Sequence, residues 1–263
     1  MSDISEETAL LRIEGPVAFI TMNRPASYNS FNKSMAKAVQ DHLQACHDND
    51  AIRAVVLTGA GKAFCAGQDL VEVKDLDAEA LYAIVEAYYN TIVKQIRNMP
   101  KPVLAAVNGV AAGAGANIAL ACDIVVASEK ASFIQAFSKI GLIPDSGGTY
   151  TLPRLIGLQR ATALMMLGEK VSAADAETMG MIYKHFTVDE FTGAVEKLAH
   201  QLGNMPTKGL AYTKALLNQT FQNDFEAQLA LEGVYQKKAG QSADYKEGVA
   251  AFVEKRTPNF IGQ

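Results

Sequence analysis

The sequence of 263 residues has no tryptophan, no run of basic residues and no apolar stretch of the length that a membrane span needs. A net charge of −4 without a basic run argues against nucleic acid as a partner. Residues 1–8 are polar and acidic, unlike a signal peptide. We therefore expect a cytoplasmic protein that binds neither nucleic acid nor a membrane.

Cysteine is scarce: the chain has three, Cys46, Cys65 and Cys122. They have no paired spacing and no nearby histidine cluster. Such cysteines are typical of reduced packing residues in the cytosol, and we expect no catalytic role for Cys65. The four histidines are scattered, and neither a metal-ligand spacing nor a GxxxxGK[ST] phosphate loop occurs. The sequence therefore predicts no metal site.

The most informative stretch is 101–129, which opens with an apolar run at 102–107 that predicts a buried strand. A turn of small residues follows at 108–115, then a short apolar helix at about 114–121 and a strand at 123–127. Small residues let the backbone approach a ligand, and free amides at a helix start can receive negative charge. The alternative is that they only let helix and strand pack closely.

A second turn of small residues, 58–70, follows another predicted strand at 54–57. Two such turns, brought together by a parallel sheet, could supply two N–H donors to one developing oxyanion. Strands that alternate with helices predict a right-handed wound α/β core. The other expected elements are a hairpin over 10–22, a helix over 31–48 capped by Asn32, a loop at 71–77, a helix over 78–97, an extended segment at 132–137, helices at 149–156, 160–167 and 173–179, a strand at 182–188, and helices from 191 to 255 with a break at Pro206.

Three stretches in register resemble the enoyl-CoA hydratase/isomerase (crotonase) superfamily: AFCAGQDL (63–70), NGVAAGAGANIALACD (108–123) and GLIPDSGGTYTLPRLIG (141–157). The resemblance implies an α/β fold with a crotonase-type spiral of ββα units over 1–200 and a C-terminal helical trimerisation region over 201–263. It implies a CoA-thioester substrate, in which coenzyme A is part of the substrate and not a cofactor. A homotrimer or a hexamer built as a dimer of trimers is expected.

The resemblance places the two main-chain donors of an oxyanion hole at Ala66 and Ala114. Hydratase members carry two glutamates that activate water, and here those positions are Asn117 and Phe137, neither of which is a base at neutral pH. The remaining acid is Asp145, at a position where several isomerase members are acidic. An apolar pocket would raise its pKa, and one carboxylate can move a proton between two carbons without water. The alternative is that Asp145 only bonds amides of its turn.

For coenzyme A, the resemblance implies contacts from Arg24, from Lys62, and from Phe252 and Lys255, the last two often contributed by a neighbouring subunit. Asp69 is expected to brace its turn, and Asn117 either orients a substrate atom or caps local structure. The tyrosines at 82, 88 and 89 are expected mainly in core packing. The candidates around the acyl group are Gln68, Asp69, Leu70, Val73, Leu81, Tyr82, Asn117 and Phe137, with ordinary packing as the alternative for each.

Within the family, the chain is most similar to members that isomerise ring-1,2-epoxyphenylacetyl-CoA to its oxepin form. The stretches that carry this likeness include FIQAFSKIGLIPDSGGTYTLPRLIG and QKKAGQSADYKEGVAAF. The likeness predicts an isomerase of phenylacetate catabolism that also shifts 3-enoyl-CoA to 2-enoyl-CoA, and it leaves contacts with other enzymes of that pathway open. Two alternatives stay open, a straight-chain 3,2-enoyl-CoA isomerase and a non-catalytic member that binds acyl-CoA.

Overall fold

The computed structural model describes residues 7–263, so most of the polar segment 1–8 lies outside the described residues. The strands are β1 (Ala9–Glu14), β2 (Val17–Met22), β3 (Ala54–Gly59), β4 (Ala63–Cys65), β5 (Val103–Val107), β6 (Val110–Ala112), β7 (Ile124–Ser128), β8 (Ser132–Ile134), β9 (Lys170–Ser172) and β10 (Lys184–Phe186). They form a six-stranded sheet of order β1-β2-β3-β5-β7-β10 and a smaller sheet of order β4-β6-β8-β9.

Successive strands alternate between the two sheets, which produces the spiral. In each of the pairs β3–β4, β5–β6 and β7–β8, the first strand joins the larger sheet and the second joins the smaller one. Neighbours within each sheet are parallel from one turn to the next, β3 with β5 and β4 with β6, for example. The antiparallel pairs β1–β2 and β8–β9 lie at sheet edges. The expected spiral of ββα units is thus confirmed.

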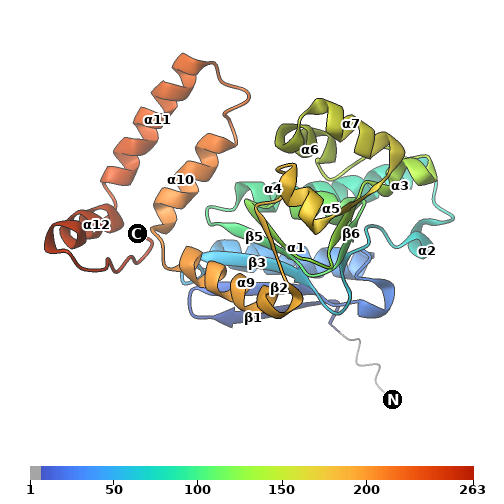
Figure 1. Cartoon of the computed structure of the whole chain (residues 1–263), viewed down its shortest axis with the longest axis horizontal. Coiled ribbons are helices and arrows are strands. Elements are labelled where there is room, and N and C mark those ends of the chain that lie inside the picture. Colours follow the sequence, from blue (N-terminus) through green and yellow to red (C-terminus); the bar gives the residue numbers. More distant parts are fainter. Residues whose placement is uncertain (1–6) are drawn as a thin grey trace.

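Helices connect the turns of the spiral and form the C-terminal part (Figure 1). They are α1 (Lys33–Asp48), α2 (Leu70–Val73), α3 (Ala78–Ile84), α4 (Thr91–Asn98), α5 (Ala114–Ala121), α6 (Gly148–Ile156), α7 (Leu158–Leu167), α8 (Ala173–Thr178), α9 (Val188–Gly203), α10 (Thr207–Leu217), α11 (Phe225–Gly240) and α12 (Ala243–Glu254). Short 3-10 turns, η1 (Pro25–Ser27) and η3 (Ala136–Ile140), and a π-helical segment, η2 (Val85–Asn90), complete the list.

The helix predictions are right in position and incomplete in detail. The side chain of Asn32 caps α1 by accepting from the amide of Met35 at 2.9 Å, as expected. The helix expected over 78–97 is continuous but is π-helical in the middle, at η2. The loop expected at 71–77 begins inside the short helix α2.

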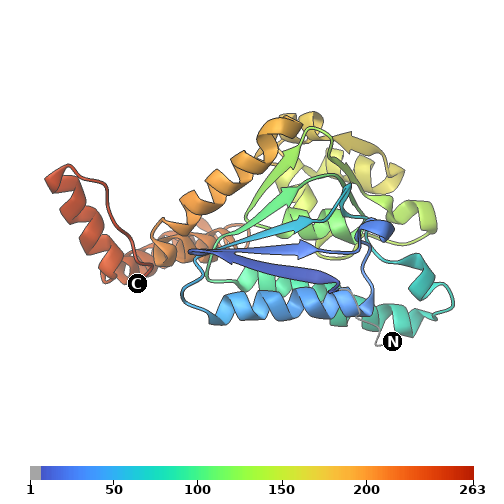
Figure 2. The same cartoon turned by 90° about the horizontal axis from the view of Figure 1, so that it is seen from below.

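The larger sheet is covered on both faces, so its central strands are apolar on both sides. Alternate residues of β3 face opposite layers: Leu57 packs in the cluster that holds Val39 of α1, and Val56 packs in the cluster that holds Ala199 of α9. Figure 2 shows α1 (blue) and α9 (orange) on opposite sides of this sheet. Each fully buried aliphatic side chain stabilises such a layer by about 1.5–3 kcal/mol.

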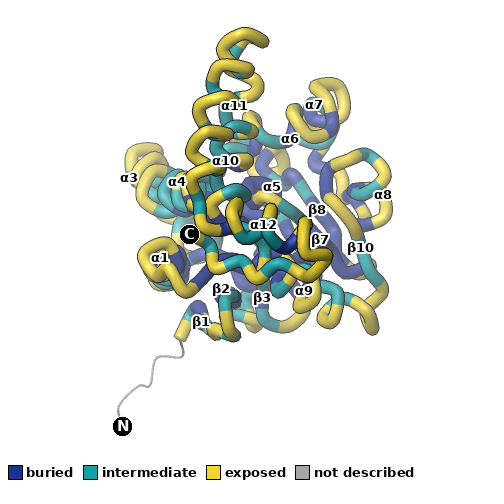
Figure 3. The backbone as a smooth tube through the Cα atoms, turned by 90° about the vertical axis from the view of Figure 1, so that its left-hand side faces the viewer, coloured by how far each residue is buried: buried dark blue, intermediate teal, exposed yellow. Residues whose placement is uncertain are grey.

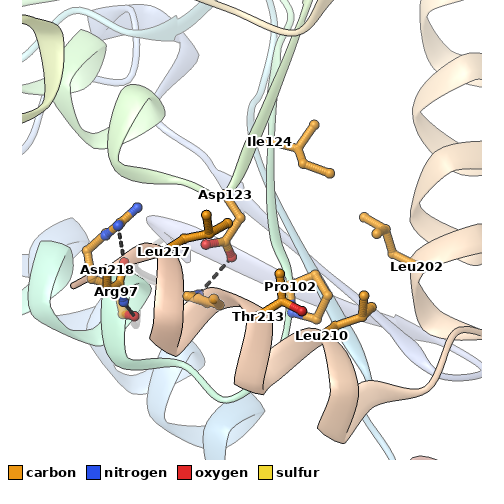
Figure 4. Close-up of a pocket in the computed structure, with 10 residues that line it drawn as sticks. Arg97, Pro102, Asp123, Ile124, Leu202, Leu210, Thr213, Leu217 and Asn218 are labelled. Carbon is orange, nitrogen blue, oxygen red and sulfur yellow. Dashed lines mark hydrogen bonds and ion pairs between the residues drawn. The ribbon is translucent and has the colours of Figure 1, made fainter. Parts of the chain in front are cut away.

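The C-terminal helices α10 to α12 extend away from the spiral as an arm (Figure 1). Helix α10 is fastened to the core beside β7, where the ammonium of Lys214 lies 2.7 Å from a carboxylate oxygen of Asp123, next to a small cavity of about 240 Å³ (Figure 4). Helix α11 has no buried residue and is mostly exposed along its length (Figure 3). Within residues 7–263 no helix combines the length and the apolar character required to cross a membrane.

Candidate active site

A largely apolar cavity of about 500 Å³ lies where the turn after β4, the start of α5, the helix through η2 and the segment 136–145 meet. Its size is typical of a small-molecule site. Leu70, Val73, Leu81 and Tyr82, expected at the pocket wall, all line it, as do Tyr89 and Phe137. Asp145 is the single carboxylate among the described residues that line this cavity.

The two turns of small residues pack backbone against backbone. A Cβ on Gly115 would lie 2.3 Å from the carbonyl oxygen of Cys65, which leaves room only for glycine. A Cβ on Gly67 would lie 3.0 Å from the carbonyl oxygen of Ala112 and 3.5 Å from the amide nitrogen of Ala114. The close approach expected from the small residues therefore occurs, and it places the turn after β4 against the first amide of α5.

One of the two main-chain N–H donors predicted for the oxyanion hole is not free in the structure. The N–H of Ala66 donates to the carbonyl of Tyr28 at 3.0 Å, so the prediction of Ala66 as a free donor is wrong. Within residues 7–263 no acceptor pairs with the N–H of Gln68 or of Ala114. Ala114 is the first residue of α5, where the helix geometry leaves the amide without an internal partner. Gln68 and Ala114 therefore supply two free donors at this junction, and both residues line the cavity.

Asp145 is half-buried, and its burial raises its pKa from 3.8 to about 6. The hydroxyl of Ser146 donates to Oδ1 at 2.8 Å, which opposes this rise because it favours the charged form. Ser146 is buried and has a left-handed backbone (φ 53°), which turns its side chain back toward Asp145. Within residues 7–263 no cation pairs with Asp145.

The side chain of Gln68 is held in the cavity wall by Tyr89. The tyrosine hydroxyl donates to Oε1, and Nε2 of Gln68 donates to the carbonyl of Phe31 at 3.0 Å. Tyr89 is only 2% exposed, and burial raises its pKa, so it stays a hydroxyl. Tyr89 packs in the core, as expected, and also lines the cavity, whereas Tyr82 lies at the cavity wall. The π-helical segment η2 changes the rotation of the helix at this point, a feature often seen at functional sites.

Arg24 and Asp69 brace the same turn from outside the cavity. The guanidinium of Arg24 lies 2.9 Å from Oδ2 of Asp69, and Asp69 caps α2 by accepting from the amide of Val71 at 3.2 Å. Asp69 is therefore a bracing residue, as expected. Arg24 was expected to contact coenzyme A, and in this structure its charge faces Asp69 instead.

The remaining predicted contacts lie outside the cavity. Lys62 is exposed in the turn between β3 and β4. Phe252, which is 85% exposed, and Lys255 lie at the end of α12, on the opposite side of the molecule from α3 and the cavity (Figure 1). One chain alone does not bring them to the site. Asn117 is fully buried in α5 and does not line the cavity.

Within residues 7–263 neither Cys65 nor a metal-binding cluster contributes reactive chemistry to the site. Cys65 is fully buried behind the turn, and burial raises its pKa to about 12, so no thiolate forms at neutral pH. The described residues contain no group of histidine, cysteine and acidic side chains that could hold a metal ion.

The fold and site define an α/β protein in which two free main-chain donors and one carboxylate meet at an apolar cavity. Residues 12–263 match the model of the enoyl-CoA hydratase/isomerase family, and the chain belongs to this crotonase family. It is an enzyme of the hydratase or isomerase kind that acts on CoA thioesters.

Several relatives span the whole chain. It is 46% identical over 261 residues to a 1,2-epoxyphenylacetyl-CoA isomerase of Escherichia coli strain K12, covering 98% of this chain and 99% of that protein. It is 42% identical to a protein of Rhodobacter capsulatus named "Probable enoyl-CoA hydratase", covering 99% and 100%. The crystal structure of an enoyl-CoA hydratase from Bacillus anthracis superposes with a TM-score of 0.93 at 32% identity, covering 97% of this chain and all of that one.

Proposed function

We propose that the protein is an isomerase of CoA thioesters in which Asp145 is the acid and base and the amides of Gln68 and Ala114 form the oxyanion hole. The observation that carries the proposal is the single carboxylate at the cavity, half-buried and without a cation partner in the described chain. Asn117 and Phe137 stand where hydratase members are expected to carry glutamates, and neither can activate water.

The chemistry follows from these groups. The thioester carbonyl oxygen accepts from the two free amides, which stabilise the enolate that forms when a proton leaves a neighbouring carbon. Removal of one such donor typically costs about 3 kcal/mol of transition-state stabilisation. The carboxylate of Asp145 takes that proton and returns it to another carbon, so no atom is gained or lost. A pKa of about 6 keeps the carboxylate ionised at neutral pH and still basic enough for the transfer.

The substrate that we favour is ring-1,2-epoxyphenylacetyl-CoA, converted to oxepin-CoA in phenylacetate catabolism. The 46% identity to an isomerase of that name supports this choice, and an apolar cavity of about 500 Å³ suits an aryl group. A shift of 3-enoyl-CoA to 2-enoyl-CoA needs the same two elements and is a second activity of the same site.

The active form is proposed to be a homotrimer or a dimer of trimers. The exposed arm supports this, because Phe225 and Phe252 are 73% and 85% exposed in one chain. Isolated apolar side chains are ordinary on a surface, but an arm without any buried residue in α11 needs a partner surface. In such an assembly Phe252 and Lys255 of one copy would reach the coenzyme A of another, and sedimentation equilibrium would measure the mass.

The test is turnover of purified protein on ring-1,2-epoxyphenylacetyl-CoA, on a 3-enoyl-CoA and on a 2-enoyl-CoA, with products followed by mass spectrometry. We expect isomerisation of the first two and no addition of water to the third. Asp145→Asn should lower turnover by about 10²–10⁴-fold while thioester binding, measured by calorimetry, changes little. Turnover of the 3-enoyl substrate alone would make the protein a straight-chain isomerase, and full activity of Asp145→Asn would remove Asp145 from the mechanism.

A further inference from the structure

The main chain of Asp145 is held by a buried pair of amide side chains behind the cavity. Asn117 lies in the middle of α5 with no exposed surface, and its Nδ2 donates to the carbonyl oxygen of Asp145 at 2.9 Å. Gln135, which follows β8 and is 4% exposed, donates from Nε2 to Oδ1 of Asn117 at 2.8 Å. The chain of contacts therefore runs from β8 through α5 to the backbone of the acid.

The main-chain carbonyl of Asp145 determines which groups donate and which accept in these hydrogen bonds. The main-chain carbonyl of Asp145 can only accept, so Asn117 must present its NH₂ group to it. Its oxygen then faces Gln135, and only the NH₂ group of Gln135 can complete the pair. The carbonyl of Asp145 thus fixes which way the amide of Asn117 is turned, and the donation from Gln135 stabilises that orientation.

Close packing restricts the position of the same carbonyl. It also accepts from the amide of Gly148, the first residue of α6, at 2.8 Å. A Cβ on Gly148 would lie 2.2 Å from Nδ2 of Asn117, so α6 begins directly against the asparagine side chain. The carbonyl of Asp145 is therefore held between α5 and α6, which sets where its carboxylate enters the cavity.

We propose that Asn117 and Gln135 are positioning residues that hold the carboxylate of Asp145 at the reacting carbons. This role rests on the proposed function, because it requires Asp145 to carry the proton. Asn117 was considered as a substrate contact from the sequence, and the geometry assigns it to the backbone of the acid instead. A displacement of about 1 Å in such a group can lower turnover by roughly 10²-fold.

The experiment compares four variants with the same CoA thioester: Asn117→Ala, Gln135→Leu, Asp145→Asn and Ser132→Ala. Asn117→Ala should lower kcat by on the order of 10²-fold with KM within about twofold, because the acid moves and the thioester contacts stay. It should also displace the acid limb of the pH profile of kcat, since the burial of Asp145 changes. Gln135→Leu should act in the same direction with a loss of roughly fivefold, about the net value of one hydrogen bond.

Ser132→Ala is the matched control. Ser132 lies three residues before Gln135, is 1% exposed, and its hydroxyl has no partner among the described residues. Its removal disturbs the same buried layer without touching the amide pair, so kcat and the pH profile should stay as in the parent protein.

The outcomes separate the two proposals. Full turnover by Asp145→Asn refutes the proposed function, and the positioning role with it. An inactive Asp145→Asn together with a folded Asn117→Ala of unchanged kcat and pH profile refutes the positioning role alone. An equal loss in Ser132→Ala would also refute it, since any change in this layer would then have the same effect. If Asn117→Ala does not fold, Gln135→Leu decides by the same two measurements.

Discussion

Two aspartates of the described chain, Asp123 and Asp145, keep partial access to water and have opposite surroundings. Asp123 accepts from the ammonium of Lys214 at 2.7 Å (Figure 4) and from the amide of Val103 at 2.8 Å. Asp145 accepts from the hydroxyl of Ser146 and has no cation partner within residues 7–263. The carboxylate of Asp123 is paired with a cation where the arm joins the core. The carboxylate of Asp145 lies at the cavity without such a cation.

The difference explains why one pair is structural and the other group is suited to chemistry. Burial lowers the pKa of Lys214, and Asp123 opposes that fall, so the ammonium can stay charged and hold α10 on the core. At Asp145 burial acts without a cation to oppose it and raises the pKa to about 6. A shielded carboxylate with a raised pKa at a cavity is a typical mark of a functional site.

The largest expected effect comes from leaving Asp123 without its cation. Lys214→Met should lower the free energy of unfolding by about 2–4 kcal/mol, below the usual loss for a fully buried pair because the side chain of Asp123 is 19% exposed. Urea denaturation monitored by circular dichroism measures it. The double variant Lys214→Met with Asp123→Asn is the control, because it removes both charges and keeps an acceptor for the amide of Val103. A loss below about 1 kcal/mol in the single variant would show that the joint does not depend on the pair.

The second prediction is that Asp145→Asn raises the free energy of unfolding, because the ionised carboxylate of Asp145 destabilises the fold. Its pKa is higher in the folded chain than the ordinary 3.8, so the neutral acid favours folding below about pH 4 and this contribution is lost as the pH rises through about 6. Asparagine cannot ionise. Asp145→Asn should therefore be more stable than the parent by at most about 3 kcal/mol above pH 6, and by nothing below pH 4.

Chemical denaturation at pH 4, 5, 6 and 7.5 measures this difference. A difference in unfolding free energy that stays constant across this pH series would mean that burial does not raise the pKa of Asp145. Loss of stability in Asp145→Asn at every pH would contradict the comparison with Asp123 directly.

Much of the fold could be predicted from local pattern. Helix α5 has the bounds expected from its small apolar residues, 114–121, and Asn32 caps α1 as expected. These features depend on side-chain type and spacing, which a sequence displays. The π-helical segment η2 could not be predicted, because one altered hydrogen-bond step in a helix leaves no compositional signal.

The site was less predictable because its donors are backbone groups. Motif spacing indicates the turn at 66–68, but only the dihedral angles decide which amide faces the cavity, and that of Ala66 is used by Tyr28. Gln135 acts through Asn117, a partner 18 residues away that its sequence neighbours do not identify. The proposed contacts of Phe252 and Lys255 with coenzyme A require a second copy of the chain, which one sequence does not describe.

The smallest effect tests the side-chain hydrogen bond that the carboxylate of Asp145 receives from Ser146. The donation from Ser146 lowers the pKa of Asp145, so Ser146→Ala should move the acid limb of kcat/KM from about pH 6 toward higher pH, by less than about one unit for a bond worth about 1 kcal/mol. In the parent protein activity should fall about tenfold per pH unit below the limb, because the base must be ionised. Alanine keeps a Cβ at the same left-handed position (φ 53°), so the backbone strain is matched. A limb that moves to lower pH would show that a group other than the Asp145 carboxylate sets it. A shift upward with kcat at pH 8 almost unchanged would show that the hydrogen bond from Ser146 opposes the effect of burial on this acid.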